Sequence, residues 1–434
     1  MRCCVMSRVE VRSAAVRLQS GNNDSMRRSV LLVFPLFPYP ARENGISIRW
    51  APILEHLAQH NEVHVVVICA NEVHAPDLER LQGLCASVRI HRRERVTPSG
   101  MKRALVRLRS MLPGATPHAL YCYDRASIAS FMRKVAREDH DAIVWVSMWY
   151  TDVALEVFDP QRIVLDAIDS SYLHHSRLAK RTLSHWLDGL ALRAWERMVS
   201  GRVRASVYIS PVDARAFMDE VCDQSRIEVI PNGVYIQDYK AHGATEPRHG
   251  ARTPDTTLTL GYLGNMAYPP NIEAAQRLSG ILRAVQQRDA DFRLVIIGRS
   301  PAPEVQALAA EDVVVTGTVD TIWPYVEQVD YFVFPMRSGA GQQNKVLEAM
   351  YAEKVVICNA MANGGIGGVS GEHLVICDTD EEFVEAILAL KSAPERARQI
   401  ARNARQFVID NYSWSGILPR FDALLDAAAA GAIR

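Results

Sequence analysis

Short apolar runs alternate with amphipathic stretches from Val30 onward, an alternation typical of βαβ units in a parallel sheet. The first half predicts strands near Val30–Phe34, Val63–Ile68, Val88–His91, Ala142–Ser147, Arg162–Leu165, Ala205–Ile209 and Arg226–Ile230. The second half predicts strands near Leu258–Leu263, Phe292–Ile297, Val313–Thr316, Tyr331–Phe334, Val355–Cys358 and Leu374–Ile376, then helices near Thr379–Lys391, Pro394–Asn411 and Trp414–Ala430. The pattern therefore predicts an α/β protein with two doubly wound lobes that face each other across a cleft.

A polar segment separates the two halves. Residues 241–256, AHGATEPRHGARTPDT, are rich in Gly, Pro and Thr, as linkers are. We therefore expect an N-terminal lobe over residues 29–240 and a C-terminal lobe over residues 257–412, with a helix over residues 413–434 that crosses back to the N-terminal lobe. Because Met26 stands just before the first strand, residues 1–28 are expected to be a disordered tail or a non-native start.

Composition narrows the class of protein. A chain of 434 residues with 48% hydrophobic residues can fold into two or three domains. The formal net charge is zero, so no overall field indicates nucleic acid as a partner. No apolar stretch reaches the length of a signal peptide or a membrane span, which predicts a cytoplasmic protein. Eight scattered cysteines without metal-ligand spacing predict buried thiols in a reducing compartment: Cys3, Cys4, Cys69, Cys85, Cys122, Cys222, Cys358 and Cys377.

The stretch 337–350, RSGAGQQNKVLEAM, joins a loop of small residues to a short predicted helix. Glycines let a backbone approach an anion closely, and a helix start points unpaired N–H groups and a positive dipole end at that anion. Lys345 adds a charge suited to a diphosphate, and Glu348, one turn later, is placed to accept hydrogen bonds from ribose hydroxyls. The pattern favours a nucleotide diphosphate site. The alternative is an ordinary turn in which Lys345 is a solvated surface charge.

Candidate residues also follow the strands of the first half. Gly45 falls in the loop after the first strand, where an ordinary βα connection is the alternative. Asp166 and Asp169 fall at the carboxyl end of the strand at residues 162–165, the edge at which parallel sheets carry catalytic groups. Asp169 is the better candidate for the cleft. Its alternative role is a helix N-cap, because Asp is a strong capping residue.

Two sites in the second half lie at the same kind of edge. Gly264 and Asn265 follow the first strand of this half, and such small residues would admit a phosphate or a sugar to the cleft floor. Arg299 follows the next strand and brings a guanidinium to that edge, with a surface cation as the alternative.

Five motifs together carry a family resemblance: N-G-V at Asn232, L-G-Y-L-G-N-M at Leu260, I-I-G-R at Ile296, V-T-G-T-V at Val315 and N-K-V-L-E-A-M at Asn344. Their order resembles retaining family 4 glycosyltransferases of the GT-B fold, and the Q-N-K-V-L-E-A-M form resembles sugar transferases of exopolysaccharide assembly. The resemblance implies two Rossmann-like lobes, a nucleotide-diphosphate-sugar donor on the second, and a glycan or lipid-linked acceptor on the first. It also implies hexosyl transfer in polysaccharide or glycolipid biosynthesis, with no cofactor and no catalytic metal.

On this resemblance Asp169 and Lys345 are assigned catalytic roles. The donor would be bound by Gly264, Asn265, Arg299, Gly339, Gly341, Asn344, Lys345, Val346 and Glu348, and Gly45 would belong to the cleft loop of the first lobe. The chain departs from the family pattern twice. Ala340 stands where relatives often carry the first glutamate of an E-x7-E motif, and Asp169 is the nearest polar residue to a histidine of many relatives.

Two other signals are set aside. Asp378, Thr379 and Asp380 resemble a D-x-D metal motif, but Thr379 with Glu382 forms a capping box ahead of an apolar helical run. The glycine-rich residues 364–371 do not match G-x-G-x-x-G, so a nicotinamide cofactor is not expected.

The segment from Arg89 to Leu112 is strongly basic, and Met101, Leu105, Leu108 and Leu112 share one face of a predicted helix. Such a helix suits peripheral contact with an anionic membrane at its inner face. The alternative is a solvated basic helix packed on the first lobe.

Three functions remain open at the level of sequence. The first is sugar transfer. The second is a nucleotide-sugar epimerase on the same fold, which would turn over donor without an acceptor. The third is a catalytically silent nucleotide-sugar-binding scaffold, suggested by Ala340.

Overall fold

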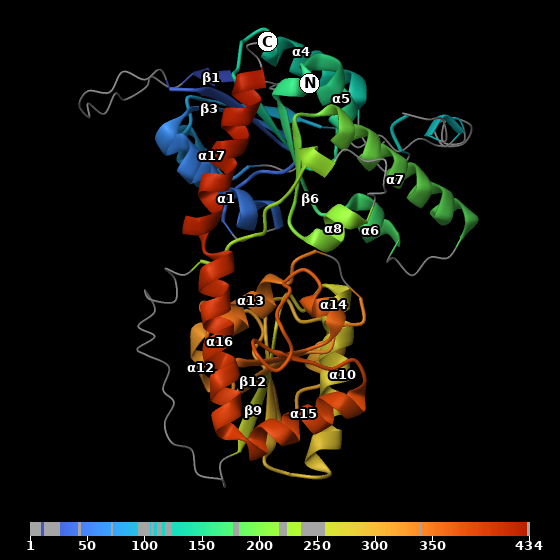
Figure 1. Ribbon diagram of the computed structural model, residues 1–434, viewed down its shortest axis with the longest axis vertical. Coiled ribbons are helices and arrows are strands. Elements are labelled where there is room, and N and C mark those ends of the chain that lie inside the picture. Colours follow the sequence, from blue (N-terminus) through green and yellow to red (C-terminus); the bar gives the residue numbers. More distant parts are fainter. Residues whose placement is uncertain are drawn as a thin grey trace, which may run out of the picture. The chain divides into compact units, whose positions relative to one another are not determined.

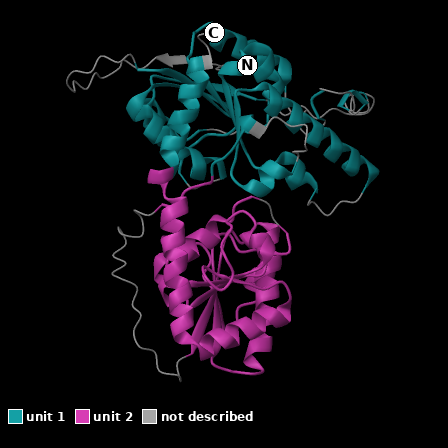
Figure 2. Cartoon of the chain, viewed as in Figure 1, with its two compact units in different colours: residues 1–230, 417–434 teal, residues 231–416 magenta. Residues whose placement is uncertain are grey.

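The computed structural model describes residues 10–12, 27–41, 45–70, 73–93, 105, 108–110, 115–117, 124–176, 182–216, 224–235, 257–338 and 341–431. The chain divides into two compact units, Met1–Ile230 with Ile417–Arg434, and Pro231–Gly416 (Figure 2). The segment predicted as a linker, 241–256, and most of the tail predicted over residues 1–28 lie outside the described residues.

The first unit is built on a sheet whose described strands follow the order β1-β4-β3-β2-β5-β6-β7-β8. These strands are β1 (Glu10–Arg12), β2 (Ser29–Phe34), β3 (Glu62–Cys69), β4 (Ser87–Arg92), β5 (Ala142–Val146), β6 (Ile163–Ile168), β7 (Ala205–Tyr208) and β8 (Ile227–Val229). All pairs are parallel except β1 with β4, which is antiparallel. The strands predicted for this half are confirmed, because parallel strands buried on both faces need continuous apolar runs. The short β1 carries no such run and was not predicted.

Helices cover both faces of this sheet, with α1 and α17 on one side and α4, α5 and α7 on the other (Figure 1). The helices are α1 (Gly45–His60), α2 (Ala75–Leu84), α4 (Arg125–Val135), α5 (Thr151–Val157), α6 (Ser171–Ser176), α7 (Leu183–Arg202), α8 (Pro211–Arg215) and α17 (Trp414–Gly431), with short 3-10 turns η2 (Pro160–Arg162) and η3 (Gln224–Arg226). Residues of α17 from Ile417 belong to the first unit. There the Phe421 ring packs edge-on against Trp50, with the ring centroids 5.8 Å apart.

The second unit has a fully parallel sheet in the order β11-β10-β9-β12-β13-β14. Its strands are β9 (Leu258–Leu263), β10 (Phe292–Ile297), β11 (Val313–Val315), β12 (Tyr331–Phe334), β13 (Val355–Cys358) and β14 (Val375–Ile376). Its helices are α10 (Pro269–Gln286), α11 (Pro303–Gln306), α12 (Trp323–Gln328), α13 (Asn344–Tyr351), α14 (Ala360–Asn363), α15 (Asp380–Ser392) and α16 (Pro394–Tyr412). Helices α10 and α15 pack together on one side of the sheet, and α13 and α16 on the other (Figure 1).

Each sheet reverses its strand order once. In the first unit the chain builds outward from β2 to β4 and then returns to β5 on the other side of β2. In the second unit the same reversal separates β9 from β12. Ligands of doubly wound sheets bind beyond the carboxyl ends of the strands at such reversals. Two doubly wound α/β units are therefore present, as predicted.

Candidate functional site

Lys345 lies in the first turn of α13, beyond the carboxyl end of β12 and thus at the strand reversal of the second unit. Its Nζ donates hydrogen bonds to Asn271 Oδ1 at 2.6 Å and to the Tyr262 hydroxyl at 2.9 Å, and lies 3.3 Å from Met336 Sδ. Tyr262 belongs to β9 and Asn271 to α10. Lys345 therefore joins the two strands that flank the reversal, and the alternative of a solvated surface charge is wrong.

The surroundings of the ammonium group are largely apolar. Nζ lies over the Tyr262 ring, 4.9 Å from its centroid, and 5.8 Å from the centroid of Phe334. Burial lowers the pKa of Lys345 to about 7. Within the part of the chain that the structure describes, Lys345 makes no ion pair with a carboxylate. Its partners among the described residues are therefore neutral oxygens, the Met336 thioether and ring faces.

Asn271 links Lys345 to two residues predicted to bind a donor. Its Nδ2 donates to the backbone carbonyl of Asn265 at 2.9 Å, while its Oδ1 also accepts from the Tyr262 hydroxyl at 2.9 Å. A Cβ on Gly264 would lie 2.8 Å from Asn271 Nδ2, so this position requires glycine. The structure therefore brings Gly264, Asn265 and Lys345 together. Asn271 and Tyr262 were not predicted as site residues, although Tyr262 lies within the L-G-Y-L-G-N-M motif and Asn271 follows that motif by five positions.

The loop before α13 is held on two sides. Gln342, which is buried, accepts from the Asn232 N–H and donates to the Asn232 carbonyl, both at 2.9 Å. A Cβ on Gly365 would lie 2.9 Å from the Gly341 carbonyl oxygen, so the glycine-rich segment set aside above packs directly against this loop. Gly341 adopts a φ of 69°, a conformation that favours glycine. Gly339 and Ala340 lie outside the described residues.

Two backbone N–H groups at the start of α13, which were predicted to be available to an anion, already have hydrogen-bond partners. The Asn344 N–H donates to the Gln342 carbonyl at 3.1 Å and the Val346 N–H to the Gln343 carbonyl at 2.9 Å, so these two donors are already used within the turn. The Val346 side chain is fully buried in the hydrophobic core and cannot line a ligand site, because it faces the sheet. Asn344 Oδ1 is buried and has no hydrogen-bond partner among the described residues.

Glu348 and Arg299 occupy different surroundings. Glu348 is half-buried on α13, one turn after Lys345. Arg299 is exposed after β10, and its carbonyl accepts from the Met266 N–H at 3.0 Å. A Cβ on Gly298 would lie 1.7 Å from the Gly264 carbonyl oxygen, so the ends of β9 and β10 meet closely at this edge.

In the first unit, Asp169 is half-buried at the carboxyl end of β6. Ile168 just before it has a φ of 68°, a strained conformation for a β-branched residue of the kind that clusters at functional sites. The expected alternative, Asp169 as the helix cap, is wrong because Ser170 takes that place: its Oγ accepts from the Leu173 N–H at 3.1 Å.

A buried glutamate, Glu196, fixes the turn between β6 and α6 through hydrogen bonds. Glu196 of α7 accepts from Ser170 Oγ at 2.7 Å and from the backbone N–H groups of Ser171 at 2.5 Å and Tyr172 at 3.3 Å. Burial raises the pKa of Glu196 to about 7, although these hydrogen bonds act in the opposite direction. Glu196 was not predicted as a site residue, because no motif near it in the sequence marks it.

Asp166 has a structural role. Its carboxylate accepts from Arg49 Nε at 2.8 Å, Arg49 Nη2 at 3.0 Å and Trp50 Nε1 at 2.6 Å. Arg49 and Asp166 are both fully buried, and the pair ties α1 to β6. Gly45 is the first residue of α1 rather than a loop residue, and a Cβ there would meet no atom within 4 Å.

Two smaller predictions are confirmed. Thr379 and Glu382 form the capping box of α15, which explains the D-x-D resemblance as a helix start. The described cysteines Cys69, Cys85, Cys358 and Cys377 are buried thiols that form no disulfide bond. The other four cysteines lie outside the described residues. Of the segment from Arg89 to Leu112, residues 94–104, 106–107 and 111–112 also lie outside them.

Comparison with known proteins defines the class. Residues 44–233 match the family model described as a glycosyl transferase 4-like domain, and residues 257–392 match the one described as glycosyl transferases group 1. The chain therefore belongs to the family 4 glycosyltransferases, and its two doubly wound units are those of the GT-B fold.

Individual relatives are more distant. The lipopolysaccharide 1,2-N-acetylglucosaminetransferase of Salmonella typhimurium is 22% identical over 238 residues, which cover 50% of this chain and 61% of that protein. Sucrose-phosphate synthase from Thermosynechococcus elongatus shares the fold with a TM-score of 0.64 and 15% identity, over 93% of this chain and 100% of the other. HepE of Anabaena, solved with UDP and glucose, has a TM-score of 0.62 and 12% identity, over 92% and 100%.

Proposed function

We propose that this protein transfers a hexosyl group from a nucleotide-diphosphate-sugar donor to a glycan or lipid-linked acceptor in polysaccharide or glycolipid biosynthesis. The observation that carries the proposal is the Lys345 ammonium, enclosed at the β9/β12 reversal without a carboxylate partner among the described residues. A buried cation without a counter-charge is costly in the free protein, and an anionic ligand supplies the missing charge. Because the chain belongs to the family 4 glycosyltransferases, we propose that this anion is the diphosphate of the nucleotide-sugar donor.

The chemistry follows from where charge develops. As the bond from the anomeric carbon to the diphosphate breaks, negative charge grows on the leaving oxygen. Lys345 is placed to stabilise that oxygen, with Tyr262 and Asn271 orienting the ammonium group. The acceptor hydroxyl forms the new glycosidic bond and its proton passes to the leaving phosphate. Glu348, one turn along α13, would hold the ribose hydroxyls.

The finer assignments follow the family. We propose that transfer retains the anomeric configuration and that Asp169 contacts the sugar or acceptor from the first unit, supported by the strained Ile168 before it. Nuclear magnetic resonance of the product's anomeric proton tests retention directly. An inverted product would end that assignment without touching the donor site.

Peripheral membrane contact is a further part of this proposal. Leu105 and Leu108, within the basic segment Arg89–Leu112, are 60% and 67% exposed, and Leu183 and Trp186 of α7 are 73% and 60% exposed. Apolar side chains with neighbouring arginines suit the surface of an anionic bilayer. Within the described residues, no helix combines the length and apolar character needed to span a bilayer.

Liposome flotation tests the membrane contact. Replacing Leu105 and Leu108 with serine should reduce binding to anionic vesicles, and Trp186→Ser should reduce it further. Val314, 48% exposed in the second unit, supplies a matched control as Val314→Ser. Equal flotation of all variants would end the membrane assignment.

A thermal-shift panel of nucleotide-diphosphate sugars tests the donor site. Uridine diphosphate sugars come first, because HepE was solved with UDP and glucose. One donor should raise the melting temperature of the wild type, and the shift should be lost in Lys345→Met and Glu348→Gln. Lys391→Met is the matched control, since Lys391 also lies over an aromatic ring, 5.0 Å from the Phe292 centroid, but pairs with Asp289 at 2.6 Å.

The outcome also separates the competing functions. Donor turnover without an acceptor would favour an epimerase. Donor binding with no transfer to any pooled acceptor would favour a silent scaffold.

A further inference from the structure

A cavity of about 530 Å³ opens in the first unit between α4, α5 and α7. This volume falls within the range of about 300–1,000 Å³ that small-molecule sites occupy. Its lining includes Arg109, Arg125 and Arg202, and none of the residues assigned above to the donor or to Asp169.

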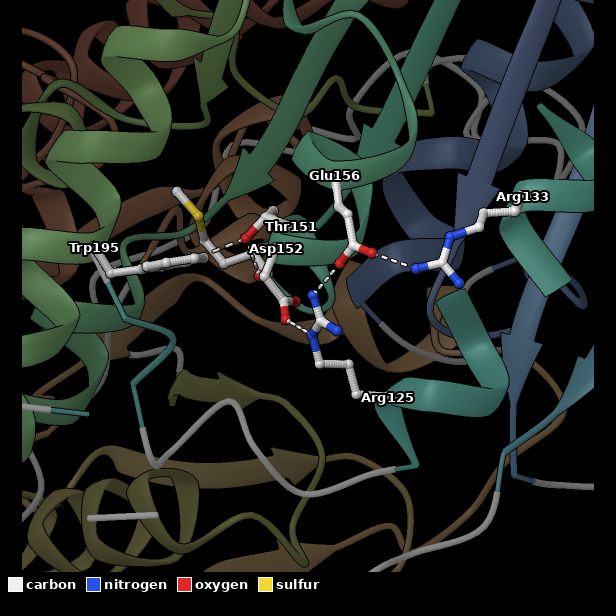
Figure 3. A network of polar contacts seen from close by, with 7 residues as sticks. Arg125, Arg133, Thr151, Asp152, Glu156 and Trp195 are labelled. Carbon is white, nitrogen blue, oxygen red and sulfur yellow. Dashed lines mark hydrogen bonds and ion pairs between the residues drawn. The ribbon is translucent and has the colours of Figure 1, made fainter. Parts of the chain in front are cut away.

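One wall of the cavity is a fixed network of charges (Figure 3). Arg125 donates to Asp152 through Nε and to Glu156 through Nη2, the latter at 2.5 Å. The second oxygen of Glu156 accepts from Arg133. Trp195 Nε1 donates to Thr151 Oγ1 at 3.1 Å and so ties α7 to the start of α5. Both carboxylates of the wall are thus neutralised by guanidinium groups of α4.

Two further arginines leave the cavity positively charged. Arg109 and Arg202 line it, and neither makes an ion pair within the part of the chain that the structure describes. Because Arg125 and Arg133 already match Asp152 and Glu156, these two guanidinium groups add positive charge that no acid among the described lining residues offsets. Guanidinium groups bind phosphate oxygens through two parallel hydrogen bonds, so the surplus is suited to a phosphoryl group.

The rest of the lining has a different character. Leu155, Trp195 and Met198 supply apolar surface beside the arginines. A ligand that fills the cavity must therefore combine an anionic group with a small body able to lie against apolar and aromatic side chains. A phosphate ester of a polyol or sugar has this combination, because the C–H faces of its body pack on such surfaces while its phosphate meets the arginines.

We propose that this cavity is a second binding site, for a phosphate ester of a small polyol or sugar, held by Arg109 and Arg202. The same chemistry occurs in two sources, a free phosphate ester and the headgroup of a phospholipid. The site goes beyond the proposed donor and acceptor chemistry, and it stands whether or not Lys345 binds a diphosphate.

Calorimetric titration of the full chain with glycerol 3-phosphate at low ionic strength tests the site, since salt screens exposed charges. The wild type should bind, and Arg109→Gln/Arg202→Gln should weaken binding by about tenfold or more. Arg137→Gln/Arg215→Gln removes the same charge from two exposed positions of the first unit outside the cavity and should leave binding unchanged. Ala115→Trp, which fills the cavity with all charges kept, should abolish binding.

Flotation with phosphatidylglycerol vesicles forms the second arm and identifies the source. Binding of glycerol 3-phosphate that depends on the two arginines assigns the site to a free ester. Vesicle binding that depends on them, with no binding of the free ester, assigns it to a lipid headgroup. The proposal is overturned if neither probe binds, or if the control pair loses as much binding as the cavity pair.

Discussion

Each unit holds a positive charge between packed elements, but Arg49 of the first unit is fully buried and Lys345 of the second is half-buried, and their partners differ. In the first unit, Arg49 meets Asp166 through two hydrogen bonds, at 2.8 and 3.0 Å, and both side chains are fully buried. In the second unit, the partners of the Lys345 ammonium among the described residues are the oxygens of Tyr262 and Asn271, a thioether and two ring faces. The Arg49 charge is paired with a carboxylate inside the fold, whereas no carboxylate of the described residues pairs with Lys345.

The difference separates structure from function. The two charges of a buried ion pair neutralise each other, so neither is available to bind a charged ligand. A buried lysine with neutral partners has its charged form disfavoured, which is why the pKa of Lys345 falls to about 7. An anion bound beside Lys345 favours the charged form of the lysine. Lys345 in turn attracts the anion, so its charge contributes to ligand binding.

The largest expected effect is on the paired charge. Arg49→Met should lower the free energy of unfolding by about 3–5 kcal/mol, because Asp166 then stays buried without a counter-charge. Urea unfolding followed by circular dichroism measures it. Arg49→Met/Asp166→Leu should recover most of the loss. A single variant as stable as the wild type would show that the pair is not what holds α1 to β6.

Removing the charge of Lys345 should lower activity without lowering stability. Lys345→Met should lower kcat/KM for sugar transfer by about 10²–10³, the usual effect of deleting a donor that stabilises a developing oxyanion. Its free energy of unfolding should stay equal or rise, since a buried charge is lost. Lys391→Met should keep its activity. A destabilised but active Lys345→Met protein would reverse the comparison.

The pH dependence of donor binding tests whether the Lys345 charge contributes to binding. Each phosphate of the donor carries one ester and one anhydride bond and keeps a constant single negative charge, so Lys345 is the group at the proposed diphosphate site whose protonation changes near pH 7. With a pKa of about 7 in the free protein, Lys345 must take up a proton to bind at higher pH. Affinity should therefore be constant below pH 7 and fall by up to about tenfold per pH unit above it. Calorimetric titration between pH 6 and 9 measures this, and Lys345→Arg should flatten the profile.

The smallest effect concerns Glu196, a buried acid that no cation pairs in the described structure. Its pKa of about 7 lies above the value of 4.5 for an exposed glutamate, so the folded state binds more protons between these values. This contribution to stability is complete below about pH 4.5 and lost as pH rises through 7. Glu196→Gln should therefore flatten the pH dependence of the free energy of unfolding by about 2–3 kcal/mol between pH 5 and pH 8.

Urea unfolding of both proteins at pH 5 and pH 8 checks the Glu196 prediction. Asp422→Asn, at the exposed end of a contact with His56, is a control of the same chemical change. Identical slopes for Glu196→Gln and the wild type would contradict it.

The sequence predicted the elements well because their causes are local. A buried parallel strand must be a continuous apolar run, as Leu258–Leu263 is, and the capping box at Thr379 needs only residues three positions apart. The same locality explains the failures. Val346 sits in a functional motif, yet helix geometry turns its side chain into the core. Nothing in the chain near Ser170 marks Glu196, which lies 26 positions away.

The sequence by itself determined the two α/β units, the family and the candidate anion-binding turn, because apolar periodicity, glycines and a lysine after a strand are local signals. Only the tertiary structure decided what each charge does. Lys345 meets Asn271 across 74 positions of chain and Arg49 meets Asp166 across 117. The sheet topology decides which strands are neighbours. That choice determines whether a charge is buried and whether an opposite charge lies next to it, and no local sequence pattern predicts it.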